Sequence, residues 1–239
     1  MLFRATDIEV TLTGDVGVFH AVKGVSLKLD GGDILDITGP SGAGKSTLLH
    51  ALGLQVVSPQ GAMFLNDVAH LSFTAQQWRR HVALVQQKPV LVAGSIEENL
   101  YLPWSLKLYT NEQRPSQEAL LQALERAHLE DIALDRPIDK LSVGQQARVA
   151  FLRTLLTDPE VLLLDEVDAA LDDESAEAIG EMTGTFAHKG KAVVRVRHRA
   201  DDGRATRHLL MQEGRMVGKD PWLATSDDTC AKGEEGVFR

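Results

Sequence analysis

The sequence has almost no cysteine, no long hydrophobic run and no excess of basic charge. Its single cysteine, Cys230, cannot form an internal disulfide, which fits a reducing compartment. No apolar stretch approaches the roughly 18 residues of a membrane-spanning helix, and residues 1–7 lack the apolar core of a signal peptide. The eight histidines are scattered without the spacing of metal ligands, so we expect no zinc site.

The charge balance narrows the class of partner. With 25 Lys and Arg against 34 Asp and Glu, the formal net charge is −9, which argues against nucleic acid as the main partner. The one basic cluster comprises Arg195, Arg197, His198 and Arg199, and we expect it to be a charged strand edge. The 239 residues are 44% hydrophobic and 25% charged, enough for one large globular α/β domain or a domain with a smaller lobe.

A phosphate-binding loop of the complete G-x-x-x-x-G-K-[ST] type is the most informative feature of the chain. An apolar run at 34–37 leads into it and a helical pattern at 47–52 follows, as this loop requires. Glycines let backbone N–H groups close around phosphates, the Lys45 ammonium adds a positive charge, and the Ser46 hydroxyl can ligate Mg²⁺. The predicted phosphate-binding residues are Gly39, Pro40, Ser41, Gly42, Ala43, Gly44, Lys45, Ser46 and Thr47.

Periodicity predicts an α/β fold with a helical insertion. Residues 74–80 are typical of a short helix or turn, and helical spacing recurs from 145 to 156. Residues 95–140 are typical of helices with polar faces, so we expect a helical lobe at about 95–157 inserted in a single domain of residues 1–218, followed by a short tail at 219–239. Alternation and apolar runs predict strands at 7–13, 25–30, 62–66, 81–85, 161–164 and 192–196.

A second acidic motif follows the apolar run 161–164. A strand that ends in a carboxylate can hold Mg²⁺ directly or through water, so we expect this of Asp165. Glu166 lies one residue further and is placed to polarise a water in line with a γ-phosphate, an effect of roughly 10²–10⁴-fold in rate. Without the phosphate loop, the two residues would be read as solvated carboxylates at a strand end.

Residues 141–146 open a predicted helix. Ser142 is well suited to be its N-cap, which is the ordinary structural explanation. The functional explanation is that the helix N-terminus and the Ser142 hydroxyl bind a second phosphate group. We favour the second because the segment begins shortly before the acidic motif and directly after the helical stretch.

The order of these motifs resembles the ATP-binding subunit of ABC transporters, over residues 7–218. It comprises the phosphate loop, Gln87, the Leu-Ser-x-Gly-Gln segment 141–145, the Asp-Glu pair, the Ala-Leu-Asp segment 170–172, and His198. The resemblance implies a P-loop NTPase core with an antiparallel N-terminal β-subdomain and a helical lobe. It also implies an ATPase at the cytoplasmic face of the membrane that powers a separate integral-membrane permease. The competing hypothesis is a soluble ATPase of the same superfamily, acting in repair or translation.

The resemblance also assigns individual residues. Gln87 would contact Mg²⁺ and the attacking water, and His198 would contact the γ-phosphate. Asp172 would lie in the loop that crosses to a partner subunit. The signature residues Ser142, Gly144 and Gln145 would seal ATP bound to a second copy, which implies an ATP-dependent head-to-tail homodimer.

The sequence departs from the family pattern at three points. Val143 replaces the usual first glycine of the signature, although its backbone N–H remains. Arg197 stands where the family often has threonine. No aromatic residue is clearly placed to stack on adenine: Val16 lies near the usual position, and Phe19 is either the base platform or a buried core residue.

A narrower resemblance concerns the small FetA-type ATP-binding subunits, which are proposed iron exporters. The stretches at 36–40, 98–104 and 148–155 carry it, and it implies metal export. Trp104 lies in the lobe that, in the family, receives the coupling helix of the membrane subunit; a core tryptophan of the lobe is the alternative.

Overall fold

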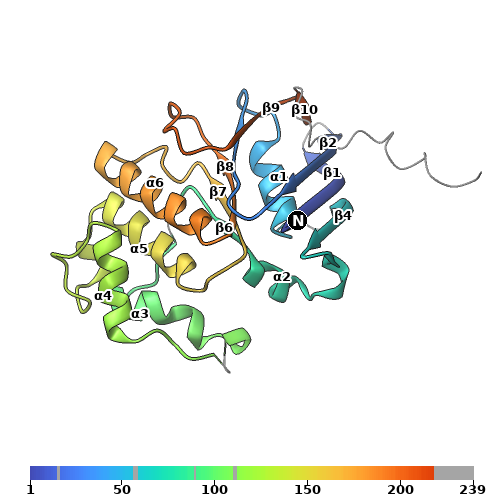
Figure 1. Ribbon diagram of the computed structural model, residues 1–239. Coiled ribbons are helices and arrows are strands. Elements are labelled where there is room, and N and C mark those ends of the chain that lie inside the picture. The colour runs from blue at the N-terminus through green and yellow to red at the C-terminus, as the bar shows by residue number, and fades with distance from the viewer. Residues whose placement is uncertain (15–16, 56–58, 89, 110–111, 218–239) are drawn as a thin grey trace, which may run out of the picture.

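Two β-sheets and six α-helices form the part of the computed structural model that is described, which comprises residues 1–14, 17–55, 59–88, 90–109 and 112–217 (Figure 1). The predicted tail at 219–239 and Val16 lie outside these residues. Within these ranges, no helix combines the length and apolar character needed to cross a bilayer.

The smaller sheet is antiparallel. Its four strands run in the order β2-β1-β4-β5. Alternating residues of β1 and β2 point into one core, which confirms the strand predictions at 7–13 and 25–30 and lengthens both. The strands are β1 (Phe3–Gly14), β2 (Gly17–Leu29), β4 (Gln60–Leu65) and β5 (Val68–Ala69).

The larger sheet carries the candidate site at its carboxyl ends. Its six strands run in the order β10-β9-β3-β8-β7-β6, parallel from β9 to β6, while β10 pairs antiparallel with β9. The strands are β3 (Ile34–Thr38), β6 (Val82–Val85), β7 (Val161–Asp165), β8 (Ala192–Val196), β9 (Arg207–Gln212) and β10 (Arg215–Val217).

Helices cover both faces of the larger sheet. Figure 1 shows α1 between the two sheets, whereas α3 to α6 lie beyond the other face of the larger sheet. The α-helices are α1 (Lys45–Leu52), α2 (Ala75–His81), α3 (Ile96–Tyr101), α4 (Gln117–Arg126), α5 (Val143–Leu155) and α6 (Asp173–His188). Short 3₁₀ turns are η1 (His70–Ser72), η2 (Leu102–Ser105), η3 (Lys107–Tyr109) and η4 (Ile138–Lys140).

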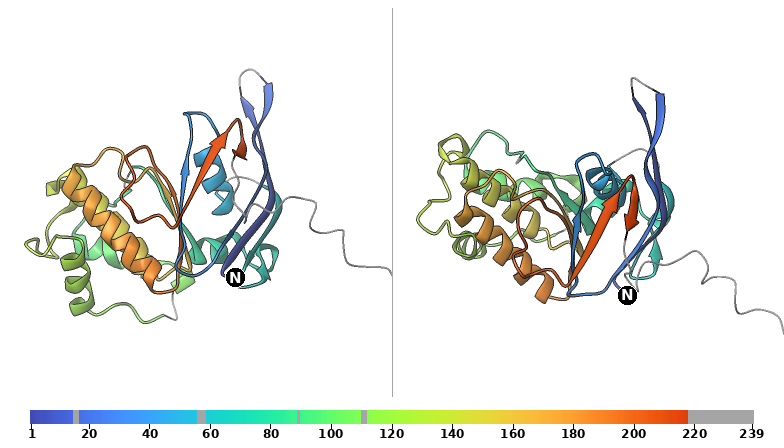
Figure 2. Two further views of the ribbon diagram at one scale, coloured as in Figure 1. Left: turned by 45° about the horizontal axis from the view of Figure 1, so that its top comes forward. Right: turned by 90° about the horizontal axis from the view of Figure 1, so that it is seen from above.

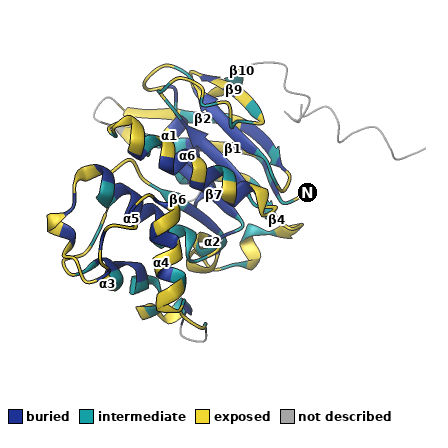
Figure 3. Ribbon diagram, turned by 60° about the vertical axis from the view of Figure 1, so that its left-hand side comes forward, coloured by how far each residue is buried: buried dark blue, intermediate teal, exposed yellow. Residues whose placement is uncertain are grey.

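Strand β7 separates two hydrophobic cores because successive side chains of a strand point to opposite faces. Leu163 packs with α1 and the smaller sheet, whereas Leu162 and Leu164 pack with α5 and α6. Figure 3 shows the strands as the buried centre, with exposed residues on the outer faces of the helices. The apolar run at 161–164 is therefore buried on both sides, as expected of a central parallel strand.

Candidate functional site

The phosphate-binding loop connects β3 to α1 in a conformation that needs glycine. Gly39 and Gly44 have φ angles of 144° and 99°. A Cβ atom would lie 2.1 Å from the Met211 carbonyl oxygen at Gly39 and 2.3 Å from the Ala21 carbonyl oxygen at Gly44. The loop is thus pressed against β9 and β2, and only residues without a side chain fit these two positions.

Lys45 opens α1 and is buried within the loop. Its Nζ atom donates hydrogen bonds to the carbonyl oxygens of Gly39 at 2.9 Å and of Pro40 at 3.0 Å. The ammonium group is therefore held by the loop itself, at the N-terminus of a helix where positive potential accumulates. This arrangement suits a polyphosphate anion.

Ser46 and Asp165 offer adjacent oxygen atoms. The Ser46 hydroxyl donates to Asp165 Oδ1 at 2.9 Å, and His50 Nε2 lies 3.8 Å from Asp165 Oδ2. Burial raises the pKa of Asp165, while the hydrogen bond from Ser46 opposes this rise. A hydroxyl beside a partly desolvated carboxylate matches the oxygen ligands that Mg²⁺ prefers, so the donor set fits that ion.

Glu166, His198 and Gln87 converge from three separate segments. His198 Nε2 lies 2.8 Å from Glu166 Oε1, and Gln87 Nε2 lies 3.5 Å from Glu166 Oε2. Glu166 has a φ of 52° at the end of β7, and its N–H donates to the Val196 carbonyl at 3.0 Å. This conformation is uncommon for a residue other than glycine, and such residues cluster at functional sites.

Lys45, Ser46, Glu166 and His198 line a cavity of about 700 Å³, whereas Asp165 and Gln87 do not line it. Phe19 lines it with an exposed fraction of 52%, so the alternative of a buried core phenylalanine is wrong. Lys23 and Glu213 also line the cavity, and no motif in the sequence predicts their presence there. The lining residues are Leu12, Phe19, His20, Ala21, Lys23, Ser41, Gly42, Gly44, Lys45, Ser46, Thr47, Glu166, His198, Glu213 and Gly214.

The remaining predicted residues form a second group, the signature group, defined as Ser142, Gly144, Gln145 and Asp172. Ser142 is the N-cap of α5, and its side chain forms a reciprocal capping box with Gln145. Asp172 caps α6, and the hydrogen bond from the Ser175 N–H lowers the pKa of its carboxyl. None of the four lines the cavity, and Figures 1 and 2 place α5 and α1 on opposite sides of the larger sheet.

Ser175 joins the two helix ends of the signature group. A Cβ atom added to Gly144 would lie 2.2 Å from Ser175 Oγ and 3.2 Å from Asp172 Oδ2. Val143 is 63% exposed, so its side chain takes no part in this contact. The predicted cap at Ser142 is confirmed, although the helix begins at Val143 rather than Gln145.

Arg199 fixes the segment that carries Asp172, a function that the sequence did not reveal. Its NH1 atom donates to the Asp168 and Leu171 carbonyl oxygens at 3.3 and 2.8 Å, and its NH2 atom pairs with Asp173. Because Arg199 follows His198 directly, one loop contacts both Glu166 and the start of α6. Backbone carbonyl partners leave no signal in a sequence, which is why this contact was missed.

The prediction that the arginine cluster forms a strand edge is wrong. Strand β8 lies between β3 and β7, and Arg195 is buried. It pairs with Asp36 on β3 and with Asp202, and Arg197 contacts Asp202 at 3.0 Å and Asp168 at 2.9 Å. These acidic partners compensate the positive charge that would otherwise exclude Arg195 from an interior strand.

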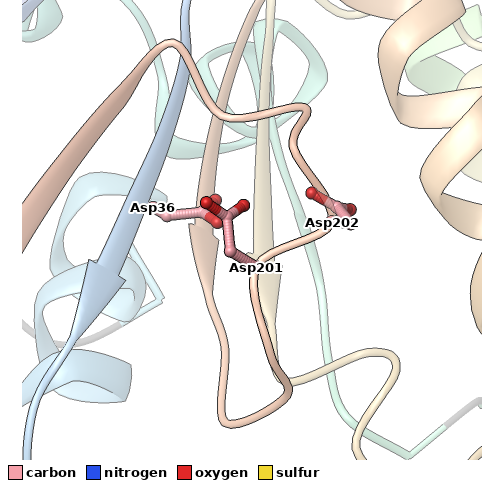
Figure 4. Close-up of side chains that lie close together, drawn as sticks. All are labelled: Asp36, Asp201 and Asp202. Carbon is pink, nitrogen blue, oxygen red and sulfur yellow. The ribbon is translucent and has the colours of Figure 1, made fainter.

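An acidic cluster lies beside this network. Figure 4 shows Asp36 on β3 facing the loop with Asp201 and Asp202, and their carboxylate oxygens lie within 4.8 Å of one another. Arg195 donates to both Asp36 and Asp202. A guanidinium therefore supplies the positive charge that two of these carboxylates require.

Comparison with known proteins finds a matching family model and similar relatives. A family model described as ABC transporter matches residues 22–169, more than half of the chain. Methionine import ATP-binding protein MetN 1 of Lactiplantibacillus plantarum is 32% identical over 222 residues, covering 90% of this chain and 62% of the relative. Probable iron export ATP-binding protein FetA of Escherichia coli (strain K12) is 31% identical over 192 residues, covering 80% of this chain and 82% of the relative.

Two solved structures of ATP-binding cassette proteins are similar to this chain. The dimeric, post-hydrolysis ATP-binding cassette MJ0796, bound to ADP and Pi, matches with a TM-score of 0.76 at 27% identity, over 90% of this chain and 96% of that one. CbiO1 from Clostridium perfringens, part of the ABC transporter complex CbiONQ, matches with a TM-score of 0.74 at 25% identity, over 90% of this chain and 86% of that one.

Proposed function

The chain belongs to the ABC transporter family of ATP-binding ATPases, and from this premise we propose that it hydrolyses ATP as a homodimer to power transport through a separate membrane subunit. The observation that supports this most is the division of the predicted residues into two groups. Lys45, Ser46, Glu166 and His198 line one cavity, and the signature group belongs to helix ends on the far side of the sheet.

Binding of the triphosphate is assigned to the loop and α1. The loop N–H groups and the Lys45 ammonium would hold the phosphate oxygens, while Phe19 at the rim of the cavity would stack on the base. Ser46, Asp165 and Gln87 would hold Mg²⁺, which when bound neutralises charge on the phosphates. The adjacent oxygens of Ser46 and Asp165 support this assignment.

Hydrolysis requires a water that attacks the γ-phosphorus atom while ADP leaves. Glu166 would accept the proton of that water, and His198 and Gln87 are close enough to orient its carboxylate. Charge that develops on the γ-phosphate would be stabilised by Lys45 and by the imidazole of His198. His198 and Gln87 would therefore act together on the Glu166 carboxylate.

The dimer follows from what each chain cannot supply to its own cavity. The N-terminus of α5 offers N–H groups and the Ser142 hydroxyl, yet neither reaches the cavity of the same chain. A second copy in head-to-tail orientation would bring its signature group against the triphosphate. The dimeric state of the similar cassette MJ0796 supports a dimer.

Attachment to the membrane is assigned to the helical lobe. A hollow of about 520 Å³ is lined by Trp104, Tyr101 and Arg114, among others. The Trp104 Nε1 atom is buried and has no hydrogen-bond partner in the described part of the chain. On this basis the chain would lie peripherally at the cytoplasmic face, and Trp104→Glu would reduce its recovery with the membrane fraction.

The competing soluble ATPases of repair or translation carry a long coiled coil or two fused cassettes. The longest helix of the described residues is α6, with 16 residues, which favours the transport hypothesis. The relatives differ in cargo: MetN 1 is a methionine importer, whereas FetA is named as an iron exporter. Iron as the cargo of this chain therefore stays a prediction.

The decisive experiment compares ATPase rates and association state. We expect Lys45→Ala and Glu166→Gln to lower the steady-state rate by about 10²–10⁴-fold. Equal rates for wild type and Lys45→Ala would remove the assigned site. Sedimentation of Glu166→Gln should give a dimer with Mg–ATP and a monomer without it; a monomer in both conditions would contradict the dimer.

A further inference from the structure

A second cavity lies far from the phosphate loop, between α4, α5 and α6. Its volume is about 270 Å³. Since an apolar cavity of about 150 Å³ suffices for benzene, this one has room for a larger molecule. It lies where the helical lobe meets the helices that pack on the larger sheet, and no residue assigned to ATP lines it.

The floor of the cavity is apolar. Ala123 of α4, Leu152 of α5, and Met182 and Phe186 of α6 are all buried and line it. Methionine is flexible enough to fill irregular apolar space, so Met182 allows this floor to adapt to a flexible apolar ligand. The floor therefore suits an alkyl group.

Two of the charged residues that line the cavity are cations without an ion-pair partner in the described part of the chain. Of its two acidic residues, Asp158 pairs with Lys191 at 3.2 Å, and Glu181 lies 3.0 Å from His128 Nε2, which carries a charge only when protonated. Arg126 and Lys189 also line the cavity, and neither has an ion-pair partner among the described residues. Two unpaired cations above an apolar floor are complementary to an anion that ends an alkyl chain.

We propose that this cavity binds a free medium-chain carboxylate, with the alkyl chain between α4, α5 and α6 and the carboxylate at Arg126 and Lys189. The bound molecule contacts α4 of the lobe and α6 of the core together, with α5 beside both. Since α5 carries Ser142 at its other end, a ligand here touches the same helix that presents the signature group. No residue assigned to ATP lines the cavity, so the proposal can be tested without nucleotide.

Isothermal titration calorimetry of the full chain with sodium octanoate, 1-octanol and octylammonium tests the proposal. We expect one octanoate per chain, at least tenfold weaker binding of octanol, and no measurable binding of octylammonium. Equal affinity for octanoate and octanol, or no binding of octanoate, would overturn the proposal. Binding to vesicles of anionic lipid without binding of octanoate would overturn it as well.

Variants separate the two parts of the site. Arg126→Gln with Lys189→Gln should weaken octanoate at least tenfold and leave octanol unchanged, whereas Thr185→Trp, at an exposed position of the lining, should abolish both. Lys140→Gln removes an exposed cation of the same lobe that does not line the cavity, and it should change nothing. An equal loss in the Lys140→Gln control would contradict the assigned positions.

Discussion

Asp36 and Arg195 are register partners on the neighbouring parallel strands β3 and β8, and their side chains form a bidentate ion pair inside the protein. Arg195 Nε lies 2.6 Å from Asp36 Oδ1, and NH2 lies 2.9 Å from Oδ2. The pair connects the strand that leads into the phosphate loop to the strand that leads to His198. The pair therefore helps to fix the position of the phosphate loop relative to His198.

Replacing Arg195 by methionine should be strongly destabilising, because the buried Asp36 carboxylate loses its bidentate partner and keeps only Arg197, whose NH1 atom lies 4.0 Å from Oδ2. Removing one member of a buried pair costs about 3–5 kcal/mol, measured as the free energy of unfolding in urea. The double variant Asp36→Leu with Arg195→Met removes both buried charges and should be more stable than Arg195→Met alone. A double variant less stable than the single one would show that the pair itself contributes the stability.

Asp202 should make the free energy of unfolding depend on pH in the acidic range. Burial raises the pKa of its carboxyl, but the hydrogen bond and charge of Arg195, together with the Arg204 N–H and the charge of Arg197, outweigh this and lower the pKa from 3.8 to about 2. Because the folded-state pKa is depressed, the stabilisation is complete above the unfolded value of 3.8 and is lost as pH falls toward about 2. Urea unfolding across this range should show a steeper loss in wild type than in Asp202→Asn; parallel curves would contradict the assignment.

Ionisation of Asp165 should destabilise the folded protein, whereas ionisation of Asp202 stabilises it. Burial raises the pKa of this carboxyl, so its charged form destabilises the folded protein at neutral pH. Asp165→Asn keeps the shape and removes the charge, so we expect a higher melting temperature without nucleotide and loss of ATPase activity. Mg–ATP should raise the melting temperature of wild type much more than that of the variant. A variant that melts below wild type without nucleotide would refute the inference.

Gly144→Ala tests the contact between the two helices of the signature group. The added methyl group would collide with Ser175 Oγ, and Ser175 is buried, so α5 must shift away from Asp172. We expect ATPase activity and ATP-dependent dimerisation to fall, while a fluorescent ATP analogue still binds the monomer through Lys45. Val143→Ala, one residue earlier at an exposed position, is the matched control and should have a smaller effect. Recovery in Gly144→Ala with Ser175→Gly would confirm the collision as the cause.

The sequence predicts those site residues whose chemistry depends on local spacing. Lys45 and Ser46 follow from one loop motif, and Asp165 and Glu166 from the end of one apolar run. The family assignment, the α/β architecture and the ATPase class are confirmed by the comparisons. Local sequence is sufficient to predict these residues because each motif adjoins a strand or helix that the same stretch of sequence predicts.

What the sequence could not reveal depends on contacts between distant segments. The partners of Arg195 lie on β3 and in the loop after β8, so local sequence does not indicate its burial and the prediction of an exposed strand edge is wrong. Arg199 binds backbone carbonyls, which every residue possesses. The position of Phe19 at the cavity depends on how the hairpin of β1 and β2 folds over the loop, and no periodicity encodes that.

The distance between the Lys45 cavity and the signature group has a genetic consequence. If each ATP is held by one group from each of two chains, a copy damaged at Lys45 and a copy damaged at Ser142 are not equivalent defects. In a mixed pair, both lesions fall on the same composite site, and the other site is assembled from intact halves. Two inactive alleles should therefore complement each other when expressed together, whereas two copies with the same lesion should not.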